Sequence, residues 1–88
     1  MKKIYKYYLN CGRMGEVSGV FVEDDEVVKK SIGCDIYFGE ILGKHSEVTT
    51  TLEENDFIVV TDNQEFIALF EEYRLDTGYN PLDYMDDE

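Results

Sequence analysis

The side chains of this 88-residue sequence that could do chemistry are scattered. His45 is the single histidine, and Cys11 and Cys34 are the two cysteines. Three such side chains are potential zinc ligands, but neither C-x-x-C nor H-x-x-x-H spacing is present. We therefore predict no metal site, and we interpret the two cysteines as free, half-buried thiols in a reducing compartment.

Catalytic motifs are also missing from the sequence. Ser46 adjoins His45, but neighbouring residues of a strand point to opposite sides, so the two do not form a nucleophile and base pair. The Gly43-Lys44 dipeptide lacks the earlier glycine of a phosphate loop. With 20 acidic residues, some pair of carboxylates is unavoidable and carries little information. The sequence predicts a binding protein, not an enzyme, with no cofactor.

Two short segments combine glycine with basic residues. They are "GRMG" at residues 12–15 and "GKHS" at residues 43–46. If the fold brought them together, Arg13, Lys44 and His45 could hold a phosphate or another anion. The alternative interpretation is that both are ordinary turns with solvated charges. A small anionic, nucleotide-like ligand is therefore the second candidate function.

The net negative charge of the chain comes entirely from its second half. Residues 1–44 carry seven acidic and seven basic residues, whereas residues 45–88 carry 13 acidic residues and one basic residue, Arg74. This half is not suited to the nucleic-acid backbone, which is bound by lysine and arginine. It is suited to a basic protein surface that normally holds nucleic acid. The alternative interpretation is that the acids serve solubility alone.

Many of these acids fall in two neighbouring segments, a turn at residues 53–56 and a helix predicted over residues 61–75. Only the strand at residues 57–61 separates them, and short connections keep consecutive elements close. We therefore expect a negative partner-binding surface made of Glu53, Glu54, Asp56, Asp62, Glu65, Glu71 and Glu72.

Hydrophobic periodicity predicts the order β-β-α-β-β-β-α. The helices are expected at residues 23–33 and 61–75, and the strands at residues 2–11, 17–22, 34–42, 47–52 and 57–61. We expect an α+β fold, an antiparallel sheet of about five strands with two helices packed on one face. The strand at 34–42 is apolar on both faces and is expected to be central.

Terminal signals support both helices. Glu23 or Asp24 can cap the first, which has acidic residues at its start and lysines near its end. Thr61 or Asp62 can cap the second. In the second helix, an apolar stripe at i, i+3, i+4 and i+7 is expected to be core: Phe66, Leu69, Phe70 and Tyr73.

The chain is expected to form one domain over residues 1–84, with a frayed acidic tail at residues 85–88. No apolar run is long enough to cross a membrane, and the segment "MKKIYKYYLN" lacks the features of a signal peptide. A cytoplasmic location follows as an expectation.

The sequence therefore favours a small acidic regulator or inhibitor, of the type encoded by phages and mobile elements. Its expected partner is a protein with a basic, nucleic-acid-handling surface, with no direct contact to nucleic acid or membrane. Self-association into a homo-oligomer stays open.

Overall fold

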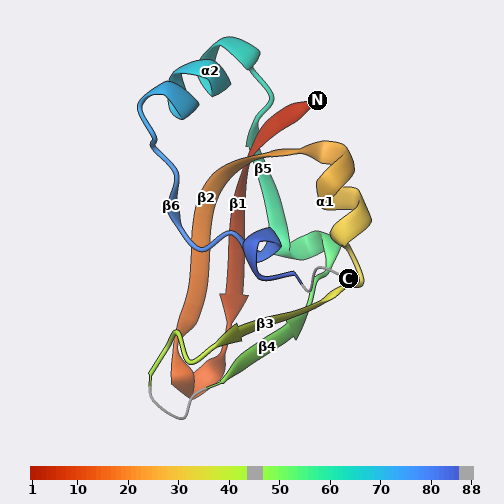
Figure 1. The fold of residues 1–88 in the computed structure, drawn as a ribbon, viewed down its shortest axis with the longest axis vertical. Helices are drawn as coiled ribbons and strands as arrows, with labels where there is room; N and C mark the ends of the chain where they lie inside the picture. Colours follow the sequence, from red (N-terminus) through yellow and green to blue (C-terminus); the bar gives the residue numbers. More distant parts are fainter. Residues whose placement is uncertain (44–46, 86–88) are drawn as a thin grey trace.

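The computed structural model describes residues 1–43 and 47–85 of the chain. The predicted α+β class is confirmed: two helices accompany a four-stranded antiparallel sheet and a separate two-stranded sheet (Figure 1). In chain order the elements are β1 (Lys2–Asn10), η1 (Gly12–Met14), β2 (Glu16–Asp24), α1 (Asp25–Ser31), β3 (Asp35–Gly39), β4 (Val48–Thr51), η2 (Glu54–Asp56), β5 (Phe57–Thr61), α2 (Gln64–Glu72), β6 (Thr77–Gly78) and η3 (Pro81–Tyr84), where η marks a 3-10 turn.

The long hairpin of β1 and β2 is the centre of the larger sheet. Its two strands pair without a register shift over nine residues each. β5 pairs with β1 and β6 pairs with β2, which gives the strand order β5-β1-β2-β6. The single sheet of about five strands expected from the sequence is therefore divided, because β5 returns to β1 and does not continue a meander from β4.

β3 and β4 form the second sheet, and the expectation that β3 is a central strand is wrong. β3 pairs with β4, and Ile36 also forms an isolated bridge with Met85. Side chains alternate along β3: Ile36 and Phe38 are buried, whereas Asp35 and Tyr37 are exposed. This alternation is typical of a strand with one face on the core and one face in water.

The main hydrophobic core lies where β3, β4 and α1 meet the larger sheet. Tyr5 and Tyr7 from β1 contribute to this core. The remaining buried members come from β2, α1, the two-stranded sheet and the residue after it: Val17, Phe21, Val28, Ile36, Phe38, Val48 and Leu52. The segment after β6 adds aromatic cover, since the ring of Tyr84 lies 4.8 Å from that of Phe38.

A second, smaller core lies on the opposite face of β1. Ile4 packs there with Ile67 and Phe70 of α2. Because Ile4 and Tyr5 are neighbours in a strand, their side chains point to opposite faces of the sheet. The two helices therefore contact opposite faces, α1 through Val28 and α2 through Ile67 and Phe70, and the expectation that both pack on one face is wrong.

Both helices begin with a side-chain cap. Asp24 caps α1 as predicted, accepting a hydrogen bond of 2.9 Å from the backbone N–H of Glu26. Asn63 caps α2, accepting from the N–H groups of Glu65 and Phe66, so the expected cap at Thr61 or Asp62 lies one or two residues too early. No helix in the described part of the chain is long and apolar enough to cross a membrane.

A close backbone contact joins the C-terminal segment to the sheet. Gly19 of β2 lies opposite Gly78 of β6, and the N–H of Tyr79 donates to the carbonyl of Ser18 at 2.9 Å. A Cβ atom on Gly19 would lie 2.7 Å from the backbone nitrogen of Tyr79. Glycine is therefore required at this position by the approach of two backbones.

Gly19→Ala should lower the free energy of unfolding by about 1–3 kcal/mol, because the added methyl group collides with backbone atoms that have little room to move. Ser18→Ala, at an exposed neighbouring position, is the control and should change stability by less than about 0.5 kcal/mol. Urea titration of both variants checks this. Equal stability of Gly19→Ala and wild type would contradict the close contact.

Tyr7→Phe should leave stability unchanged or raise it by about 1 kcal/mol at neutral pH. Tyr7 is fully buried, and its hydroxyl has no hydrogen-bond partner among the described residues. Tyr8→Phe, which removes an exposed hydroxyl bonded to Glu16, is the control.

Tyr7→Phe should also unfold less readily in alkali than the wild-type protein does. Burial raises the pKa of Tyr7 above its ordinary value of 10.0, since the ionised phenol is disfavoured inside the core. The stability that Tyr7 contributes is present below pH 10 and is lost as the pH rises above it, because the unfolded chain ionises first. Thermal melting at neutral and alkaline pH should therefore show a smaller alkaline loss for Tyr7→Phe than for wild type.

Candidate partner-binding surface

The acidic residues expected to bind a partner lie in the segments that precede and follow β5, but Glu71, near the end of α2, lies beside β2 and β6 at the opposite edge of the sheet. η2 precedes β5 and α2 follows it, and Figure 1 places these two elements at opposite ends of the strand. The η2-end acids are Glu53, Glu54 and Asp56, and the α2-end acids are Asp62, Glu65, Glu71 and Glu72. All seven are exposed apart from Asp56, which is half-buried.

The η2-end acids are held by a reciprocal capping box. The N–H of Glu53 donates to the Asp56 carboxylate at 3.1 Å, and the Glu53 side chain accepts from the backbone of Asp56. Asp56 is therefore committed partly to the turn, whereas Glu53 and Glu54 face water. The next residue, Phe57, pairs with Tyr7, which places this group beside the middle of β1.

The α2-end acids lie near the beginning of β1. Gln64 donates to the carbonyl of Lys2 at 2.9 Å, and the ammonium of Lys2 lies 3.1 Å from the carboxylate of Glu71. Both members of this ion pair are about half exposed, so it contributes little to stability. It does lower the negative charge that Glu71 presents to a partner.

The two acidic groups act as separate electrostatic centres. Four residue steps of β5 separate Phe57 from Thr61, which is about 13 Å at a rise of about 3.3 Å per residue. That distance exceeds the screening length of about 8 Å at physiological salt. The surface therefore carries two separate negative fields with a neutral strand between them.

The strand between the two groups is apolar and exposed. Ile58, Val59 and Val60 each keep between 49% and 58% of their surface in water. β5 is an edge strand of the sheet, and it contains neither a charged residue nor a proline. Natural edge strands are commonly protected by such residues, so the composition of this edge favours contact with another chain.

α2 also exposes apolar side chains, and the expected core stripe of this helix is wrong in part. Phe70 is buried, but Phe66, Leu69 and Tyr73 are between 46% and 67% exposed. Ile67, which lay outside the expected stripe, is buried with Phe70. The reason is size: a nine-residue helix at one end of a narrow sheet covers Ile4 and its neighbours with only one side of a wider apolar arc.

The two glycine-basic segments are only partly described. Arg13 is exposed in η1, and Lys44 and His45 lie outside the described residues. η1 does lie beside the β3–β4 connection, because a Cβ atom on Gly15 would be 3.9 Å from the side chain of Leu42. The turn that carries Arg13 therefore adjoins the chain that leads to Lys44.

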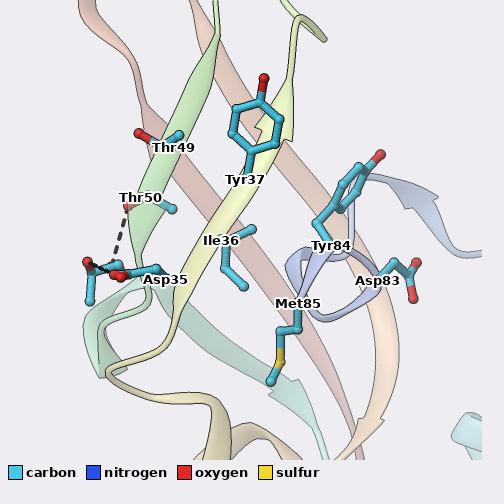
Figure 2. A pocket seen from close by; sticks show the side chains of 9 residues that line it. Asp35, Ile36, Tyr37, Thr49, Thr50, Asp83, Tyr84 and Met85 are labelled. Atoms are coloured by element: carbon cyan, nitrogen blue, oxygen red, sulfur yellow. Dashed lines mark hydrogen bonds between the residues drawn. The ribbon is translucent and has the colours of Figure 1, made fainter. Parts of the chain in front are cut away.

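A broad hollow of about 980 Å³ lies between the two-stranded sheet and η3. Figure 2 shows Tyr37 of β3 and Tyr84 of η3 at its sides, with Met85 below them. The hydroxyl of Thr51 donates to Asp35 at 2.7 Å, and the charge of Glu47 raises the pKa of Tyr37. The carboxylates of Asp35 and Asp83 disfavour an anion in this hollow.

The thiols and carboxylates do not converge on a metal. Cys11 and Cys34 are both free and half-buried, as predicted. Across residues 1–43 and 47–85, no three histidine, cysteine or acidic side chains are grouped so as to hold a metal ion. His45, the third ligand considered from the sequence, falls outside that part of the chain.

Comparison of the chain with protein-family models, with curated protein sequences and with solved structures found no match.

Sequence reasoning missed the apolar part of this surface. The almost wholly apolar run "FIVVT" predicts a strand, but nothing local places it at an edge. The acidic segments on both sides of the run do not distinguish an edge strand from a buried one, because buried strands are also bounded by polar turns.

Phe66→Ala and Phe70→Ala should differ sharply in stability. Phe70→Ala should lower the free energy of unfolding by about 3–5 kcal/mol, because it removes a buried ring from the smaller core. Phe66→Ala should cost no more than about 1 kcal/mol, since nearly half of that side chain is in water. Chemical denaturation of both variants provides the comparison, and equal losses would contradict the placement of α2.

Proposed function

We propose that this protein works by binding and not by catalysis, as an acidic regulator or inhibitor of a protein with a basic surface. Such a surface, rich in lysine and arginine, is what nucleic-acid-handling proteins present to phosphates. The observation that carries the proposal is the exposed β5 edge with acidic groups at both of its ends.

The arrangement of the acids favours this proposal over a purely solubilising role. Acids that serve solubility do not need to flank an exposed apolar strand, and an apolar edge works against solubility. Apolar contact combined with a charged border is typical of protein interfaces, in which the core excludes water and the rim is polar. Complementary charge would also speed the encounter with a basic partner.

Binding of a small anionic ligand is the second proposal. It is supported by the position of η1 and Arg13 beside the β3–β4 connection. We place it second because Arg13 is exposed in a sharp turn. The negative charge of the second half of the chain also disfavours anions.

Two charge variants test the leading proposal. The first, E53Q/E54Q/E65Q/E72Q, removes four charges from the two acidic groups and keeps the Lys2–Glu71 ion pair. The second, E16Q/D35N/E40Q/E47Q, removes four charges around the β3–β4 sheet and the start of β2. Because both lose the same net charge, a difference between them reports position and not overall charge.

Each immobilised variant is exposed to an extract of the cells that naturally contain the protein, and captured proteins are eluted with salt. We expect wild type and the second variant to retain a basic protein that nucleic acid displaces. The first variant should associate with this protein about tenfold more slowly at low salt. Equal association of both variants, or capture that nucleic acid does not affect, would refute the proposed function.

A further inference from the structure

We propose that the free edge of β5 takes up an extended segment of the basic partner as an added strand. The segment has a short apolar centre with lysine or arginine on both sides. This inference rests on the proposed function and names the form in which the partner is recognised. In strand addition, backbone hydrogen bonds provide affinity and alternate side chains provide specificity.

The register of β5 defines the available edge. Phe57, Ile58 and Val59 pair in sequence with Tyr7, Lys6 and Tyr5, so one side of this stretch is occupied by β1. After Val59 pairs with Tyr5, the next pair joins Thr61 to Ile4. Val60 is therefore left without a partner on β1 and forms a bulge. Regular pairing on the outer side is thus confined to residues 57–59 and suits a segment with about three central residues.

A groove beside this edge can receive alternate side chains of the added strand. It has a volume of about 450 Å³ and lies between β5 and α1. The charged side chains that line it carry no net charge: Lys3, Asp25, Lys29 and Glu54. Phe57 and Val59, two residues apart and so on the same face, line it from β5, while Val28 of α1 and Ile32, the residue after that helix, line it from the other side. Each is apolar, and Ile32 and Val59 are exposed, so burying aliphatic side chains here removes apolar surface from water.

Charge identifies the occupant as a basic partner and not a second copy of this chain. In an antiparallel β5–β5 pair, the η2-end acids of one copy would lie beside the α2-end acids of the other. In a parallel pair, each acidic group would lie beside its own equivalent. Either arrangement brings like charges together, which costs free energy. A strand with basic residues at both ends places opposite charges there instead.

The direct probe is a capped nine-residue peptide with the sequence Lys-Lys-Thr-Val-Thr-Val-Thr-Lys-Lys. A second peptide of the same composition carries two of its lysines in the centre and valines at the ends. A third replaces all lysines with glutamate. Binding is measured by fluorescence anisotropy at salt concentrations of about 50 mM and about 150 mM. Amide hydrogen exchange by NMR reports which strand becomes protected.

A matched pair of variants tests the groove itself. I32T/V59T removes apolar surface from the groove while keeping net charge and β-branched side chains. V27T/L75T makes the same kind of change at two other exposed aliphatic residues outside the groove. Melting temperatures of both establish that the fold is kept.

We expect the first peptide to bind tightest and to slow exchange at β5 amides. I32T/V59T should weaken it by about tenfold, and V27T/L75T should leave it unchanged. If the peptide bound I32T/V59T equally well with no protection at β5, the strand-addition inference would be wrong while the acidic function stood. No preference among the three peptides would also overturn it.

Analytical ultracentrifugation of the free protein tests whether a second copy of this chain occupies the β5 edge. We expect a monomer at both salt concentrations, with the β5 amides that point away from β1 open to exchange. A dimer whose β5 amides are protected without peptide would overturn the inference in favour of a second copy. Loss of binding in E53Q/E54Q/E65Q/E72Q alone would place recognition in the charges, whereas loss in I32T/V59T places it at the edge.

Discussion

The nine-residue ladder between β1 and β2 is the constraint on which the rest of the structure depends. Side chains on its two faces pack into different cores, since Tyr5 and Tyr7 face the two-stranded sheet and Ile4 faces α2. Its outer edges receive β5 on one side and β6 on the other. A shift of one residue between β1 and β2 would exchange the two faces and place each core's side chains on the wrong side. The surface beside β5 exists because β1 provides both its backbone partner and the buried rings beneath it.

Local signals in the sequence were sufficient for the elements and insufficient for their arrangement. The acidic start of α1, its cap at Asp24, one of the two residues expected there, and the position of β1 follow from short-range physics, and they were predicted correctly. The division into two sheets depends on which strand β5 pairs with, and that choice joins residues some 50 positions apart. The side on which each helix packs depends on the path of its connection. The contact between Gly19 and Gly78 likewise cannot be predicted from the sequence, because it depends on which backbone segments come together in the fold.

The acidic groups illustrate the same limit at the level of function. Their positions along the chain were evident, because charge is a property of composition. Their division by an exposed apolar strand was not, because an apolar run such as residues 57–61 predicts burial unless its neighbours are known. For the same reason, periodicity alone predicts Phe66 and Leu69 as core residues, although both are exposed. Helical spacing identifies an apolar face but does not say how much of that face the rest of a small protein can cover.

The unequal sizes of the two cores give the protein unequal local stability. The smaller core has three buried residues, Ile4, Ile67 and Phe70, whereas the larger has nine. Elements with little buried apolar surface open at lower free energy than the global unfolding transition. We therefore expect α2 to open locally at a lower free energy than the hairpin and the main core. Residues 62 and 63 join α2 directly to β5. Local opening of α2 would therefore release the C-terminal end of β5, so the order of this exposed strand depends on the helix.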